Sequence, residues 1–277
     1  FRFASDQTRP QFEDPGGPNY TSITASNNAV LNYHYDPKGN VRPWDRTLYI
    51  KVVRGFLREG DAIRIVFGDR SGGSPGMRLQ TFCEESYEFH TLIDPIATFC
   101  YQPMPDQPVI KIVPGKPERF LAIAPTIRAV GESFDVKFKG EDKWGNPSNK
   151  CDCQFTLRAT YQVEGLPKKV KLSRGQFAGL ISGLRVHEPA DFAIEFLDDG
   201  GALVCATNPI RIEDAPTSRH FWGDLHGQSE ETIGTGTAEA YFKFARDYAF
   251  VDAIGHQGND FQITTAFWKD LDDLCTE

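Results

Sequence analysis

Polar and apolar side chains alternate along the stretch Ser133-Phe134-Asp135-Val136-Lys137-Phe138. Because successive side chains of a β-strand point to opposite faces, this pattern predicts a strand with one buried face. Similar runs occupy residues 120–124, 153–159 and 192–196, and turn residues separate the runs about every 8 to 12 positions. The spacing therefore predicts an antiparallel β-sandwich over residues 115–215.

One turn of this region adds a resemblance to the periodicity. The segment Glu141-Asp142-Lys143-Trp144-Gly145-Asn146-Pro147 resembles a loop common in bacterial immunoglobulin-like modules. We therefore expect the sandwich to be immunoglobulin-like.

The residues before the sandwich predict a second β-rich module, over residues 1–114. Residues 1–45 are rich in Pro, Gly, Asn and Asp, which is typical of loops and short strands. Strand-like runs follow at 47–53 and 62–67, and these two segments could pair as neighbours. Prolines between 103 and 117 indicate the boundary between the two modules.

Composition and charge exclude several classes of protein. With 277 residues, 40% hydrophobic and 25% charged, the chain is too apolar for a disordered protein and long enough for more than one core. Its net charge is -8 and its Lys and Arg residues are scattered, so we expect no nucleic-acid partner. Since no apolar run approaches the ~20 residues of a membrane helix, we also expect no membrane partner.

Localisation and thiol chemistry are less constrained by the sequence. We expect a soluble protein and favour the cytoplasm slightly over export. The chain opens on Phe1-Arg2-Phe3-Ala4, which is typical of the middle of a strand, so we expect residues upstream or a removed signal peptide. Cys151 and Cys153 share a face of a predicted strand and are interpreted as buried thiols.

Helical patterns appear only after residue 215. Thr237 is a suitable N-cap for a helix over 238–248, and Thr264 can cap a second helix. Strands are predicted at 221–225 and 250–254, so residues 216–277 alternate strand, helix, strand, helix. This order is typical of the opening of a parallel α/β sheet or barrel.

Each of these two strands is followed by a histidine. His226 comes after the first strand and His256 after the second, and the ends of adjacent parallel strands meet at one edge of a sheet. Asp224 precedes His226 by two residues, and Asp260 follows His256 by four. Imidazole and carboxylate groups are suited to Zn²⁺, Mn²⁺ or Fe²⁺, so the pattern predicts a divalent-metal site.

At these residues the chain resembles the start of a PHP domain, of the polymerase and histidinol phosphatase superfamily, and an uncharacterised family within it. The first motif of that superfamily, D-L-H-x-H, is matched by Asp224-Leu225-His226-Gly227-Gln228, and the second by Ala253-Ile254-Gly255-His256. The resemblance implies a distorted β/α barrel with several metal ions. It also implies metal-assisted hydrolysis of a small-molecule substrate, often a phosphoester.

The chain departs from that pattern in three respects. Gln228 stands where the superfamily has a second His, so this weaker ligand offers a neutral oxygen, and Gly255 replaces an Asp. The later motifs are missing, because residues 216–277 hold only about two strand-helix units. We therefore expect the chain as given to be catalytically incomplete.

Other interpretations stay open at this point. Each histidine can instead fill a position at the sheet edge through a hydrogen bond. The rival function is a non-enzymatic β-sandwich binding or scaffold protein with a degenerate α/β tail. A third is carbohydrate binding on Trp44 and Trp144, and assembly into a homo-oligomer also stays open.

Overall fold

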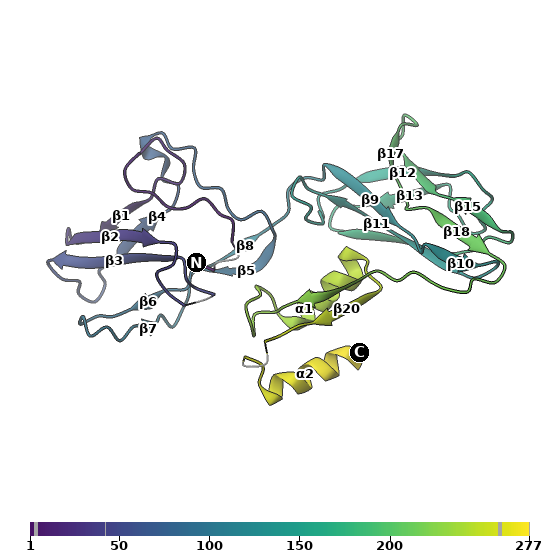
Figure 1. Cartoon of the computed structure of the whole chain (residues 1–277). Coiled ribbons are helices and arrows are strands. Elements are labelled where there is room, and N and C mark those ends of the chain that lie inside the picture. Colours follow the sequence, from purple (N-terminus) through teal and green to yellow (C-terminus); the bar gives the residue numbers. More distant parts are fainter. Residues whose placement is uncertain (3–4, 42, 260–261, 277) are drawn as a thin grey trace. The chain divides into compact units, whose positions relative to one another are not determined.

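The computed structural model describes residues 1–2, 5–41, 43–259 and 262–276, and strands make up most of their regular structure (Figure 1). The chain divides into two compact units, Phe1–Ile112 and Val113–Glu277, called here the N-terminal and C-terminal units. The predicted further division at residue 215 stays a prediction. None of the described helices is long and apolar enough to cross a lipid bilayer.

The described residues of the N-terminal unit form four antiparallel strand pairs. They are β1 (Ser22–Ala25) with β4 (Ile63–Val66), β2 (Val30–Asp36) with β3 (Thr47–Arg54), β5 (Glu84–Glu88) with β8 (Val109–Ile112), and β6 (Leu92–Ile93) with β7 (Gln102–Pro103). A 3-10 turn, η1, spans Arg70–Gly72. The runs at 47–53 and 62–67 form strands as expected, but each pairs with an earlier strand, β2 or β1, and not with the other.

Ten strands of the C-terminal unit form its β-sandwich. One sheet has the order β14-β11-β9, a second β13-β12-β16-β17, and a third β10-β18-β15. Their bounds are β9 Arg119–Ile123, β10 Ile127–Ala129, β11 Phe134–Glu141, β12 Cys153–Ala159, β13 Lys169–Leu172, β14 Ala178–Leu184, β15 Ala190–Phe192, β16 Ile194–Leu197, β17 Leu203–Ala206 and β18 Ile210–Glu213. Neighbouring strands are antiparallel except β10 and β18. The prediction of a mainly-β sandwich is confirmed.

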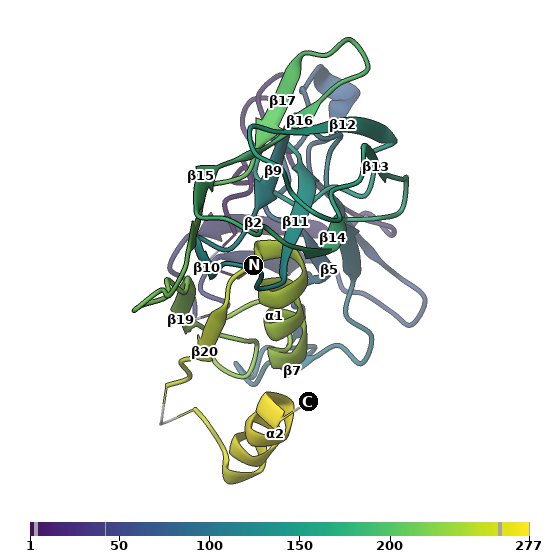
Figure 2. The same ribbon diagram turned by 90° about the vertical axis from the view of Figure 1, so that its right-hand side faces the viewer.

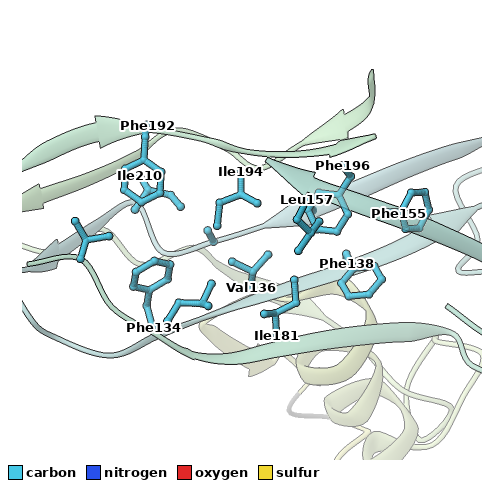
Figure 3. Close-up of a cluster of buried hydrophobic side chains, with 14 of the residues drawn as sticks. Phe134, Val136, Phe138, Phe155, Leu157, Ile181, Phe192, Ile194, Phe196 and Ile210 are labelled. Carbon is cyan, nitrogen blue, oxygen red and sulfur yellow. The ribbon is translucent and has the colours of Figure 1, made fainter. Parts of the chain in front are cut away.

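The alternating residues that predicted the sandwich form its core. Phe134 and Val136 of β11 are buried, whereas Asp135 between them is exposed. Figure 3 shows Val136, Phe138 and Ile181 pointing from one sheet toward Ile194 and Phe196 on the opposite side. The rings of Phe138 and Phe196 have centroids 5.3 Å apart, a distance at which aromatic pairs attract beyond their buried area.

The last part of the C-terminal unit contains β19 (Gly223–Gly227), α1 (Ala238–Phe244), a π-helical turn η2 (Ala245–Ala249), β20 (Ala253–His256) and α2 (Thr265–Thr276). Thr237 caps α1, since its hydroxyl oxygen accepts a hydrogen bond of 3.1 Å from Ala240 N. The strands β19 and β20 are parallel and form a two-stranded sheet.

The predicted PHP-type β/α barrel is wrong for the residues that the structure describes. A barrel closes only when every strand has a neighbour on both sides, and β19 and β20 each have one. Over the described residues the fold is mainly β, with two short α-helices, α1 and α2.

The helix formed by α1 and η2 packs on the outer face of the sheet β14-β11-β9 (Figure 2). Lys137 Nζ donates to the carbonyl oxygen of Arg246 at 3.1 Å, and Lys139 Nζ donates to that of Tyr248 at 2.5 Å. The last carbonyl groups of a helix lack partners within the helix and carry partial negative charge, so two ammonium groups stabilise this end.

Candidate functional site

The predicted ligand residues lie at the ends of β19 and β20. In the parallel register, Asp224 is opposite Ile254 and Gly227 is opposite His256, with a shift between the two pairs. Asp224 and His226 are exposed, whereas His256 is half-buried. The structure therefore brings the two strand ends together and leaves the two histidines in different environments.

His256 is hydrogen-bonded to a serine through one of its two ring nitrogens. Its Nε2 lies 2.8 Å from Ser229 Oγ, and that hydroxyl donates to Glu231 Oε2 at 2.6 Å. Because the single hydroxyl proton goes to the carboxylate, Nε2 must carry the proton that it shares with Ser229. His256 Nδ1 is then an acceptor, and it is buried without a hydrogen-bond partner among the described residues.

Burial lowers the pKa of His256 below its ordinary value, and the Glu231 carboxylate offsets part of this shift. The ring of Tyr241, on α1, and the ring of Phe267, on α2, lie beside the imidazole, with centroids 6.2 and 5.7 Å from that of His256. The imidazole is therefore neutral near pH 7, surrounded by aromatic rings, and its Nε2 is engaged.

The other predicted ligands make local hydrogen bonds. Asp224 Oδ1 accepts from the backbone N–H of His226 at 2.9 Å, and Gln228 Oε1 accepts from Thr232 Oγ1, also at 2.9 Å. Asp260 lies outside the described residues. Within the described ranges, no group of three or more His, Cys, Asp or Glu side chains could hold a metal ion.

The metal-dependent hydrolase predicted from the sequence is therefore wrong on the geometry of its centre. A hydrolytic metal centre needs about three protein ligands converging on one cation, and the described side chains do not provide that arrangement. The ligand role of each single residue, His226, His256, Asp224, Gln228 and Asp260, stays a prediction.

Sequence reasoning missed the importance of Ser229 and Tyr241. Ser229 is fully buried, although it lies in a stretch that looks like an acidic surface loop. The Tyr241 hydroxyl donates to the carbonyl oxygen of Gly255 at 3.0 Å, and a Cβ at Gly227 would lie 1.7 Å from that hydroxyl. The two glycines beside the strand ends were the available signal of this close approach.

The two tryptophans considered for carbohydrate binding differ in exposure. Trp44 is stacked on His90 at 4.7 Å between ring centroids and has Arg2 at 5.0 Å. Trp144 is 52% exposed, and Lys143 Nζ lies 4.8 Å from its ring centroid. Trp44 is thus engaged within the N-terminal unit, whereas Trp144 is the more exposed of the two.

Comparison with known proteins finds uncharacterised bacterial relatives. The chain is 24% identical over 219 residues to an uncharacterized protein of Chlamydia trachomatis serovar D, covering 77% of this chain and 34% of that protein. It is 22% identical over 197 residues to an uncharacterized protein of Chlamydia muridarum, covering 69% and 31%. The chain thus spans about a third of the length of the curated relatives that it matches.

Among solved structures, the D00-D0 domain of Intimin is similar, with a TM-score of 0.27 and 10% identity over 73% of this chain and 96% of that one. The D0-D1 domain of Intimin gives a TM-score of 0.26 and 10% identity, over 75% and 95%. We infer nothing about function from similarity at this level. No family model matches the chain, and the resemblance to the PHP superfamily, together with the hydrolase and metal-binding roles that it implied, is wrong.

Proposed function

We propose that this chain acts by binding, as a β-sandwich scaffold that presents surface loops to a partner. One observation supports this role most directly: the loop 94–101, between β6 and β7 of the N-terminal unit, exposes large apolar side chains. Ile96 is 77% exposed and Phe99 is 84% exposed. Leaving one such side chain in water forgoes about 2 kcal/mol of stabilisation, so a pair at one loop tip is typical of a contact surface.

The backbone of loop 94–101 is held in an uncommon conformation. Ala97 has φ 54° and Phe99 has φ 62°, in the left-handed region where a side chain costs on the order of 1 kcal/mol. Asp94 offsets this cost, because its Oδ2 accepts from Phe99 N at 2.6 Å and its Oδ1 accepts from Ile96 N at 3.2 Å. The apolar tip is therefore preorganised, which lowers the entropy lost on binding.

The proposed partner is a protein surface with a hydrophobic pocket, because such a pocket can cover an apolar loop tip. A second copy of this chain satisfies the same requirement, and a homo-oligomer is one form of the proposal. The sandwich of the C-terminal unit has its own continuous buried core.

Photo-crosslinking in the producing cells tests this function. A photoreactive phenylalanine analogue replaces Phe99, and the matched control carries it at Val41, which is 78% exposed in the same unit. We expect a defined adduct from position 99 that disappears in an Asp94→Ala background, because the loop loses its preorganised shape. An adduct with twice the chain mass identifies the partner as a second copy. Absence of an adduct at 99, or the same adducts from both positions, rejects the proposal.

A further inference from the structure

The N-terminal unit contains a cavity of about 400 Å³, and no residue of loop 94–101 lines it. Its walls are the connection between β1 and β2 and the connection between β3 and β4. Its polar and aromatic lining consists of Asn27, Asn28, Arg54, Phe56, Arg58 and Asp61. A cavity of this volume is within the ~300 to 1,000 Å³ range of small-molecule sites.

The two connections are fastened to each other across the cavity. Asn27 Nδ2 donates to the carbonyl oxygen of Phe56 at 2.8 Å and to Asp61 Oδ2 at 2.7 Å. Asp61 Oδ2 also accepts from Arg58 N at 2.8 Å, and Asn27 Oδ1 accepts from Ala29 N at 3.1 Å. Asn27 and Asp61 thus fix the shape of the cavity before any ligand arrives.

The charge of the lining is positive, in a chain whose net charge is -8. Arg54 and Arg58 contribute two guanidinium groups, and Asp61 contributes one carboxylate that already accepts the hydrogen bonds from Asn27 and Arg58 N. Among the described residues, neither guanidinium forms an ion pair with a carboxylate. Arg58 lies instead 5.0 Å from the ring centroid of Phe56.

Two arginines in one lining, one of them over an aromatic ring, match a specific ligand chemistry. A guanidinium binds a carboxylate through two parallel N–H···O bonds, a geometry that a neutral hydroxyl cannot reproduce. Phe56, which is largely exposed, offers an apolar surface to the C–H face of a sugar ring, and the Asn28 amide offers a donor and an acceptor to hydroxyls.

We propose that this cavity binds a sugar acid, with the carboxylate on Arg54 and Arg58 and the ring against Phe56. A free sugar acid and an acidic residue of a glycan share this chemistry. The site is separate from loop 94–101 in its residues, so either proposal can fail while the other stands.

Calorimetric titration of the full chain at low salt tests the site. Glucuronic acid is the probe, glucose is its neutral match, and an oligosaccharide that contains glucuronic acid separates the two sources. We expect glucuronate to bind, glucose to bind at least about tenfold more weakly, and the affinity to fall as salt is added. Tighter binding of the oligosaccharide than of glucuronate assigns the site to a glycan, and equal or weaker binding assigns it to the free acid.

Variants locate the binding. The double variant Arg54→Gln, Arg58→Gln should weaken glucuronate binding at least about tenfold, whereas Arg174→Gln removes an exposed charge from the C-terminal unit and should leave it unchanged. A melting curve of each variant confirms folding, because these arginines are exposed and Gln keeps most of their stem. Failure of the wild-type chain to bind glucuronate, equal binding of glucose, or full binding by the double variant overturns the proposal.

Discussion

Asp142 is a buried carboxylate that organises the turn after β11. Its oxygens accept hydrogen bonds from Gly115 N at 2.9 Å, from Trp144 N at 2.9 Å and from Asn146 N at 3.0 Å. Burial alone raises the pKa of Asp142, but the hydrogen bonds from Gly115, Asn146 and Trp144 together lower it below its ordinary value. The carboxylate therefore stays ionised and joins the start of the C-terminal unit to its sandwich.

Asp142→Ala should lower the free energy of unfolding by about 3 kcal/mol, because three backbone donors lose a charged acceptor inside the protein. Denaturant unfolding of the full chain measures the change. Asp152→Ala is the matched control, since Asp152 is exposed and its ion pair with Lys171 is at the surface. Similar losses for both variants would show that the Asp142 turn has no special role.

Two cysteines of the sandwich should resist alkylation. Burial raises the pKa of Cys151 to about 11, with a smaller contribution from Cys153, and burial also raises the pKa of Cys205 to about 11. At pH 8 only about one thiol in a thousand is then ionised, and only the thiolate reacts.

Iodoacetamide labelling of the folded chain, read by mass spectrometry, should therefore modify the exposed Cys100 and Cys275 first. Raising the pH toward 11 should increase the rate at Cys205. Labelling in denaturant is the control and should equalise all positions. Rapid labelling of Cys151 at pH 8 in the folded chain would contradict its burial.

At the scale of elements, the contact between β11 and the α1–η2 helix joins the sandwich to the β19–β20 sheet. Lys139 is buried and pairs with Glu141 Oε1 at 2.9 Å as well as with the carbonyl of Tyr248. Lys137 is half-buried, and its Nζ makes a solvent-exposed hydrogen bond to the helix and lies 5.7 Å from the ring centroid of Phe250. Removing Lys139 leaves the buried carboxylate of Glu141 with Arg119 as its remaining ion-pair partner. It also leaves the carbonyl of Tyr248 without its donor.

Lys139→Met should accordingly destabilise the C-terminal unit by about 3 kcal/mol. Lys137→Met should cost less than about 1 kcal/mol, because its hydrogen bond to the helix is exposed to solvent. Hydrogen exchange of the backbone amides of α1 and η2 reports the contact directly and should accelerate only in the first variant. Equal exchange in both variants would show that the helix does not depend on Lys139.

The sequence was informative for elements whose signal is local. The sandwich strand with Val136 and Phe138 and the helix after Thr237 were predictable, because alternation and capping involve neighbouring residues. Strand partners in the N-terminal unit were not, since β3 pairs with β2 rather than with β4 through contacts that no local pattern specifies.

The candidate site divides in the same way. The sequence placed His256 at a strand end beside β19, which the parallel register shows. Its hydrogen bond to Ser229 was not predictable, because it depends on how the loop after β19 folds back. The same loop determines that Nε2 meets a hydroxyl, so the position of His256 along the chain was predictable and its hydrogen-bond partner was not.

At the scale of the whole molecule, acid should weaken the C-terminal unit through Glu132. A backbone hydrogen bond at Ala129 and the paired Arg219 lower the pKa of Glu132 below its ordinary value. Because the folded-state pKa is depressed, the stabilisation is complete above the ordinary pKa of 4.5 and is lost as the pH falls through the folded-state value.

Thermal melts between pH 7 and pH 3 should show this loss in the wild-type chain, and Glu132→Gln should melt lower at pH 7 and depend less on pH. Glu118→Gln changes an exposed acid as the control. An unchanged pH dependence in Glu132→Gln would assign the acid sensitivity to other carboxylates.

The division between Ile112 and Val113 predicts that the two units fold independently. Residues 113–277 contain the whole sandwich core together with the Asp142 turn that holds Gly115, so a separate fragment keeps every contact of that core. Domains with their own hydrophobic core generally fold alone.

The fragment 113–277 should therefore give the β-rich circular dichroism of a folded sandwich. It should also melt within a few degrees of the corresponding transition in the full chain. Asp142→Ala should lower the melting temperature of the fragment and of that transition by the same amount. Any transition of the full chain that this change does not shift should then come from residues 1–112. An unfolded 113–277 fragment would mean that the first 112 residues contribute to the stability of the sandwich, and the chain would then unfold as one cooperative unit.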